Sequence, residues 1–103
     1  HLDILVNNAA MLGDLAPIST YQAKTWLRTM QVDLNAPFMM TQALIPVIQK
    51  AGKGTILFSV DDKTRAYWGA YGVAKHALKA LIAILADELD DERFPINVNG
   101  VNP

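Results

Sequence analysis

The stretch that decides the fold reads GTILFSV over residues 54–60, and YGVAKHALKALIAILADELD follows it over residues 71–90. The first segment is rich in β-branched and aromatic residues, which favour strands. In the second segment apolar residues recur every three or four positions, which is the pattern of an amphipathic helix. A strand followed by a helix of this length predicts one β-α unit, joined here by the polar loop 61–69.

Two further strand-like runs lie near the ends of the chain, at residues 2–7 and 96–101. A polar loop follows the first run, since residues 8–17 contain glycine, aspartate and proline. Between that loop and residue 54 the apolar pattern predicts two helices. The order is therefore β-α-α-β-α-β, which is typical of an α/β fold with a parallel sheet.

The boundaries of these two helices are predicted from capping residues. Ser19 or Thr20 is suited to cap the first helix, which we expect to run to about residue 31. Asn35 is suited to cap the second helix, and Gly52 to end it together with Gly54. We expect Pro46, inside the second pattern, to bend it.

Composition narrows the class of protein. The chain has 103 residues, 51% of them hydrophobic, which suits one small domain with a packed core. Its net charge is -1, with no basic stripe for nucleic acid, and it has no cysteine for disulfides or thiolate metal sites. Charged residues interrupt the apolar segment 74–89, so we expect no membrane span. These features fit a cytoplasmic protein without a metal site.

Tyr71 and Lys75 form the candidate catalytic pair. Residues four apart share one face of a helix, so the phenol and the ammonium can enter one pocket. A nearby cation lowers the pKa of a tyrosine. A tyrosine with a lowered pKa can exchange a proton with a carbonyl or alcohol oxygen. Because such spaced pairs recur by chance, a surface tyrosine beside a lysine is the alternative interpretation.

Five short segments, in this order and spacing, resemble the classical short-chain dehydrogenase/reductase family. They are LVNNAA at 5–10, VDLN at 32–35, GTIL at 54–57, YGVAK at 71–75 and NVNGVNP at 97–103. The resemblance covers essentially the whole chain, from the family's fourth strand to its sixth. The stretch RAYWGAY at 65–71 is similar to a bacterial subgroup of mostly uncharacterised oxidoreductases. The implied fold is a portion of a doubly wound, Rossmann-like parallel sheet.

The resemblance implies a role for each matching residue. Tyr71 would be the acid/base of hydride transfer between NAD or NADP and a small carbonyl or alcohol substrate. Lys75 would hold the nicotinamide ribose and lower the pKa of Tyr71. Further cofactor contacts are implied for Asn8, Ala9, Ala10 and Pro103.

The family's substrate-polarising serine has no clear match. It usually lies thirteen residues before the tyrosine, where this chain has Phe58. Ser59, twelve residues before Tyr71, is the nearest serine and the third candidate catalytic residue. Matching forward from Gly54 instead places Asp61 in the serine position, and an ionised aspartate cannot donate a hydrogen bond as serine does.

The chain departs from the family pattern in two more ways that affect the expected dehydrogenase activity. Asp33 stands where the family usually has an asparagine that supports a water chain to the lysine. A Gly-x-x-x-Gly-x-Gly phosphate-binding turn is expected upstream of His1, and a substrate-covering segment after Pro103. We therefore expect residues 1–103 to form a single partial domain that is inactive by itself.

Two functions stay open from the sequence. The first is an oxidoreductase of the short-chain type. The second is a catalytically inert fragment or assembly module that dimerises through its two long helices, 35–50 and 71–90. In the family these helices pair across a twofold axis, so a homodimer or homotetramer is implied in either case.

Overall fold

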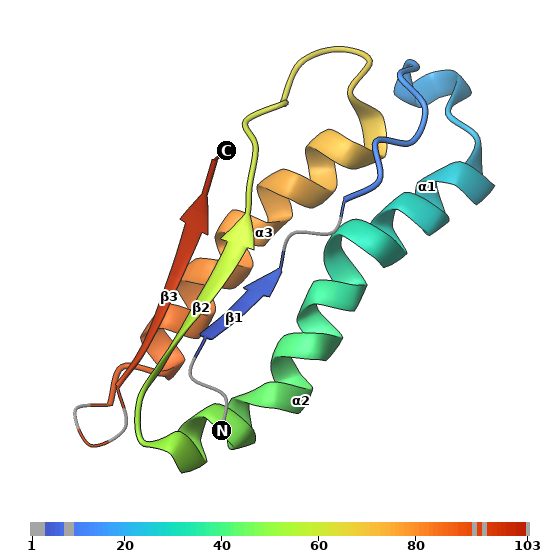
Figure 1. The fold of residues 1–103 in the computed structure, drawn as a ribbon. Helices are drawn as coiled ribbons and strands as arrows, with labels where there is room; N and C mark the ends of the chain where they lie inside the picture. The colour runs from blue at the N-terminus through green and yellow to red at the C-terminus, as the bar shows by residue number, and fades with distance from the viewer. Residues whose placement is uncertain (1–3, 8–9, 92, 94, 103) are drawn as a thin grey trace.

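Three parallel strands form one layer of the molecule and the helices form the other (Figure 1). The computed structural model describes residues 4–7, 10–91, 93 and 95–102. The strands are β1 (Ile4–Asn7), β2 (Gly54–Ser59) and β3 (Ile96–Val101), in the sheet order β1-β2-β3. Val6 pairs with Leu57 and Ile56 with Val98. The predicted α/β class, the parallel sheet and all three strands are confirmed.

The two helices predicted before β2 are one continuous helical rod. It consists of α1 (Ala23–Met30), a π-helical turn η2 (Gln31–Asn35) and α2 (Ala36–Ala51). The prediction that Asn35 caps a separate helix is wrong. Asn35 has right-handed helical dihedrals, φ -67 and ψ -42, and its side-chain amide donates to Gln31 Oε1 at 3.2 Å. The wider π turn carries the chain through residues 31–35 without a break.

The ends of these helices differ in part from expectation. Ser19 and Thr20 lie in a short 3-10 turn, η1 (Ile18–Thr20), and Gln22 is the residue that precedes α1. Gly52 ends α2 as predicted, with φ 90, a left-handed conformation that glycine adopts without strain. Gly54 instead begins β2.

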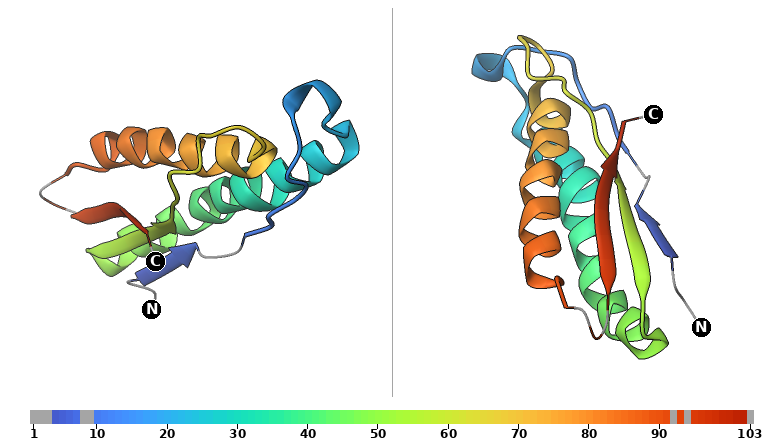
Figure 2. Two further views of the ribbon diagram at one scale, coloured as in Figure 1. Left: turned by 90° about the horizontal axis from the view of Figure 1, so that it is seen from above. Right: turned by 90° about the vertical axis from the view of Figure 1, so that its left-hand side faces the viewer.

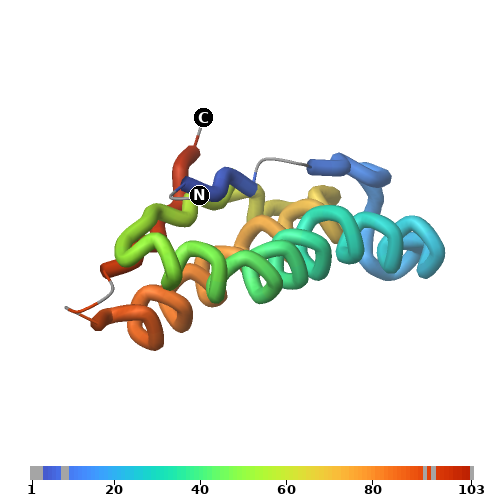
Figure 3. The backbone as a smooth tube through the Cα atoms, turned by 60° about the horizontal axis from the view of Figure 1, so that its bottom comes forward, coloured from blue at the N-terminus to red at the C-terminus, as the bar shows by residue number. Residues whose placement is uncertain are grey.

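The helices cover one face of the sheet, as Figures 2 and 3 show. The core between the layers is formed by apolar side chains of α2, α3 (Gly69–Glu88), the two longer strands and the residue directly after β2; they are Ile48, Ile56, Phe58, Val60, Leu78, Leu85, Ile96 and Val98. On β1, Ile4 and Val6 are 56% and 58% exposed. β1 is therefore covered on its helix-facing side only.

α3 satisfies a simple criterion of length and apolar content for a membrane-spanning helix, against the expectation from its charges. The same criterion is met by core helices of soluble proteins. In this fold Ala74, Leu78 and Leu85 are buried, and α3 contacts β2 and β3. α3 is the core helix of the two-layer fold.

Candidate active site

The carboxyl ends of the three strands lie at one edge of the sheet, because all three run parallel. Ligands of open α/β sheets bind at this edge. The loop 60–68 leaves β2 there and leads into the first turn of α3 (Figure 1). At the end of β1, the Asn7 side-chain amide donates to Thr41 Oγ1 at 3.1 Å and ties that strand to α2.

Tyr71 and Lys75 lie together at this edge, on the first two turns of α3. The Lys75 Nζ atom lies 6.0 Å from the centre of the Tyr71 ring. Lys75 is only 2% exposed, and its ammonium donates a 3.0 Å hydrogen bond to the carbonyl oxygen of Ser59. Ser59 therefore contributes its backbone to the site by anchoring the lysine. The other two N–H donors of the ammonium have no hydrogen-bond partner among the described residues.

Asp61 is the acidic residue that the fold brings to Tyr71. The Tyr71 hydroxyl donates to Asp61 Oδ2 at 2.9 Å, and Asp61 Oδ1 accepts a 2.7 Å bond from the backbone N–H of Asp62. Asp61 thus contacts Tyr71 as an acceptor, a role different from that of the serine donor whose position it matches. The forward match from Gly54 was the signal that pointed to this position.

The pKa of Tyr71 is raised from 10.0 to about 12. Burial is the largest cause, followed by the hydrogen bond to Asp61 and the negative charges of Asp61 and Asp33. The pKa of Tyr71 thus lies above its ordinary value and not below it, against the prediction made from its spacing to Lys75. The ammonium bonds to the Ser59 carbonyl, and burial lowers the pKa of Lys75 itself.

Asp33 is fully buried in the π turn η2. Its Oδ1 accepts a 2.6 Å hydrogen bond from the backbone N–H of Met11, which ties the loop after β1 to the helical rod. Its Oδ2 is buried with no hydrogen-bond partner in the part of the chain that the structure describes. Burial raises the pKa of this carboxyl, while the Met11 bond and the charge of Lys75 act in the opposite direction.

The segment 61–63 is held against α3 by contacts of the two residues that follow Asp61. The Asp62 carboxylate forms an ion pair with Lys79. The Lys63 carbonyl oxygen lies so close to Gly72 that any Cβ there would overlap it. The Lys63 ammonium lies 5.3 Å from the centre of the Trp68 ring. Glycine at position 72, within the Tyr-x-x-x-Lys segment, is what allows this approach.

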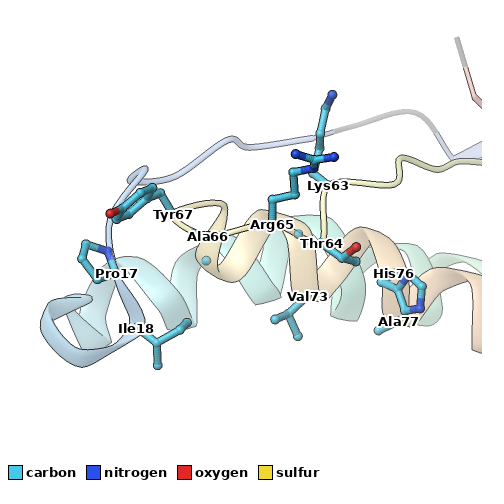
Figure 4. A pocket seen from close by; sticks show the side chains of 12 residues that line it. Pro17, Ile18, Lys63, Thr64, Arg65, Ala66, Tyr67, Val73, His76 and Ala77 are labelled. Atoms are coloured by element: carbon cyan, nitrogen blue, oxygen red, sulfur yellow. The ribbon is translucent and has the colours of Figure 1, made fainter.

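A hollow of about 690 Å³ lies beside the loop, but Tyr71 and Lys75 do not line it. Its wall includes Ile18 of η1 and, from α3, Gly72, Val73, His76 and Ala77. In Figure 4 the side chains of Lys63 and Arg65 point to the opposite side from Ile18 and Val73. The hollow is therefore an apolar surface feature, separate from Tyr71 and Lys75.

The expected cofactor contacts are only partly within the described residues. Ala10 lies in the loop after β1 and is exposed. Asn8, Ala9 and Pro103 lie outside the described residues.

The whole chain, residues 1–103, matches the family model described as short chain dehydrogenase. It is 41% identical to the uncharacterized oxidoreductase YciK of Escherichia coli K12, over 99% of this chain and 40% of that protein. It is 31% identical to human dehydrogenase/reductase SDR family member 4, over 93% of this chain and 36% of that protein. The chain thus spans about 40% of the length of these curated relatives.

Solved structures show the same likeness in three dimensions. A short chain dehydrogenase from Shigella flexneri 2a, complexed with NADP, superposes with a TM-score of 0.91 at 39% identity. One from Escherichia coli CFT073, complexed with NADPH, gives 0.91 at 40% identity. Both cover 100% of this chain and 43% of the other chain.

Proposed function

Because the chain belongs to the short-chain dehydrogenase family, we propose that the full-length protein is a nicotinamide-dependent oxidoreductase that interconverts a small carbonyl compound and its alcohol. The observation that carries this proposal is the pairing of Tyr71 and Lys75 at the carboxyl edge of the sheet. The Lys75 ammonium is nearly buried and lies 6.0 Å from the centre of the tyrosine ring. Burying a charged group costs folding free energy, so its presence here supports a functional role. A pair of groups with shifted pKa values at a ligand-binding edge, raised for Tyr71 and lowered by burial for Lys75, is a candidate catalytic site.

The residues present fit a nicotinamide dinucleotide, NAD or NADP. The two free donors of the Lys75 ammonium suit the hydroxyl groups of a ribose. Asn8, Ala9, Ala10 and Pro103 remain proposed contacts on the basis of the family pattern. When bound, the cofactor supplies or accepts the hydride. NADP is the first cofactor to test, since two of the similar structures are complexes with NADP and NADPH.

Tyr71 handles the proton in this proposal. At neutral pH its raised pKa keeps the hydroxyl protonated, ready to donate to the oxygen of a carbonyl substrate during reduction. The hydroxyl turns from Asp61 to the substrate for this step. As the proton leaves, the positive charge of Lys75 favours the phenolate that forms. Ser59 holds the lysine through its carbonyl, and a contact of its hydroxyl with substrate remains a prediction.

Further proposals concern the setting of the site. Parallel sheets are normally covered on both faces, so the exposed Ile4 and Val6 support residues 1–103 being part of a larger Rossmann-like domain. Exposed apolar side chains on α2 and α3, such as Met39 and Ile84, support a homodimer or homotetramer formed through these helices. A cytoplasmic location fits the absence of cysteine.

The family match favours the oxidoreductase over the inert assembly module, and one variant tests the choice. Tyr71→Phe in the full-length protein is expected to lower kcat by about 100- to 10,000-fold on a panel of aldehydes and ketones with NADPH. The Kd for NADPH should stay within about threefold, because the variant removes one hydroxyl group. Tyr67→Phe, at an exposed tyrosine, is the matched control and should leave both quantities unchanged.

Full turnover by Tyr71→Phe would remove Tyr71 from the mechanism. A wild-type protein that binds neither NADPH nor NADH but self-associates in sedimentation would refute the oxidoreductase and favour the assembly module.

A further inference from the structure

We propose that Asp61 is a positioning residue that holds the Tyr71 hydroxyl in its protonated, donating state and so sets the pH range over which Tyr71 can accept a proton. The inference rests on the proposed role of Tyr71 in proton transfer. It assigns to Asp61 a function different from that of the serine whose position it matches. Carbonyl reduction, which uses the protonated tyrosine, then extends to more alkaline pH, whereas alcohol oxidation, which needs a tyrosine able to accept a proton, moves to higher pH.

The hydrogen bond between Tyr71 and Asp61 has a defined donor and acceptor. An ionised carboxylate only accepts, so the 2.9 Å bond between the Tyr71 hydroxyl and Asp61 Oδ2 requires the proton on the tyrosine. A serine hydroxyl in the same place could donate to a phenolate as well as accept from a phenol. Aspartate therefore stabilises one protonation state of Tyr71, whereas serine tolerates both.

The second step is that Asp61 is held in place. Its Oδ1 accepts from the backbone N–H of Asp62 at 2.7 Å, which fixes the plane of the carboxylate. The next two residues dock onto α3, through the ion pair of Asp62 with Lys79 and the contact of the Lys63 carbonyl with Gly72. Tyr71 lies on the same helix, so loop and tyrosine are positioned by one element.

The charges around Tyr71 come from three elements. Asp61 faces it from the loop, Asp33 from the π turn η2, and Lys75 from α3 itself. The two carboxylates disfavour the phenolate and the ammonium favours it. Of the two carboxylates, Asp61 alone bonds directly to the hydroxyl. Burial acts in the same direction as Asp61 and persists when Asp61 is replaced, so replacement lowers the pKa of Tyr71 only part of the way.

The direct test measures the phenolate of Tyr71 by ultraviolet absorbance in the full-length protein without cofactor. Each spectrum is taken at an alkaline pH at which circular dichroism shows the native fold, and Tyr71→Phe provides the baseline to subtract. Asp61→Asn and Asp61→Ser are expected to lower the midpoint, the pH at which half of Tyr71 is phenolate, by about one pH unit. At a fixed pH below the midpoint this corresponds to about tenfold more phenolate. Asp61→Glu should restore most of the wild-type value.

Asp87→Asn is the matched control, since it removes the same charge near the far end of α3 and should shift nothing. An unchanged midpoint in both folded Asp61 variants would overturn the inference, as would the same shift in the Asp87 control.

Steady-state kinetics give a second readout. In the direction of alcohol oxidation, the acid limb of the kcat/KM profile should move down by about one pH unit in Asp61→Asn. If Tyr71→Phe keeps its turnover, the proposed function fails whatever the absorbance shows. If Tyr71→Phe is inactive and the profile of Asp61→Asn is unchanged, only the role of Asp61 fails.

Discussion

The backbone N–H of Met11 donates a 2.6 Å hydrogen bond to Asp33 Oδ1, and this bond joins the loop after β1 to the π turn between α1 and α2. The partner oxygen Oδ2 is buried without a hydrogen bond to the described residues. The site therefore combines a satisfied and an unsatisfied acceptor on one carboxyl group. Burial of this group raises its pKa, which links the stability of the fold to pH.

The stability prediction for Asp33 follows from the sign of that shift. With a pKa raised above 3.8 in the folded state, the folded chain binds more protons than the unfolded chain as the pH rises from about 4. The free energy of unfolding of the wild type should then fall with rising pH relative to Asp33→Asn. The measurement is urea unfolding of both proteins from about pH 4 to pH 7. A difference that stays constant across this range would contradict the prediction, and Asp87→Asn serves as the reference for a surface charge.

Gly72→Ala tests the docking of the loop. The added Cβ would overlap the Lys63 carbonyl oxygen, and backbone cannot move aside as a flexible side chain can. Alanine improves helix propensity by about 1 kcal/mol over glycine, while overpacking costs about 1–3 kcal/mol. We expect a net loss of up to about 2 kcal/mol in urea unfolding, together with a lowered midpoint for the Tyr71 phenolate. Val73→Ala, at the neighbouring exposed position, is the control and should change both quantities little. A Gly72→Ala variant that is more stable than the wild type would show that the loop does not dock as described.

The strands and α3 were predictable because their signal is periodic and local. β2 and α3 differ from their predicted bounds by no more than two residues at each end. The helical rod was missed as a unit because Asn35 is a good capping residue, and a π turn has no distinctive residue pattern. The contact between Asp61 and Tyr71 depends on how a ten-residue interval folds back, which spacing alone does not determine. The pKa of Tyr71 was predicted in the wrong direction because the sequence places Lys75 near the tyrosine but cannot show where its ammonium points.

Phe58 illustrates why the family serine cannot lie thirteen residues before the tyrosine in this chain. Its side chain is fully buried in the core between β2 and the helices. Phe58→Ser should therefore create a cavity and bury a hydroxyl, with a loss of about 3–5 kcal/mol and no gain in turnover. Phe38→Ser, at a phenylalanine that is 45% exposed, is the matched control and should cost less than about 1 kcal/mol. Higher turnover in Phe58→Ser would mean that this position reaches the active site.

The ion pair between Lys79 and Asp62 should contribute little to global stability. The two side chains are 36% and 70% exposed, and exposed pairs are typically worth less than about 1 kcal/mol. We expect Lys79→Gln to lower the free energy of unfolding by less than about 1 kcal/mol, with a smaller effect at high salt. Lys24→Gln, on the exposed surface of α1, is the control. A salt-independent loss of more than about 2 kcal/mol would show that the pair is essential to the fold of the loop.

The π turn η2 is equivalent to one extra residue inserted into an α-helix. An inserted residue in a regular helix would rotate everything after it by about 100°, but the wider π turn absorbs the extra residue, so α2 keeps the phase of a regular helix. Deleting one residue from 31–35 is therefore expected to turn this stretch into a regular α-helix with α2 still facing the sheet. The deletion would act locally, because it would move Asp33 away from the Met11 N–H that it accepts from. A single-residue gap at this turn between related chains would thus mark a change in how the loop after β1 is held, and not a rearrangement of the core.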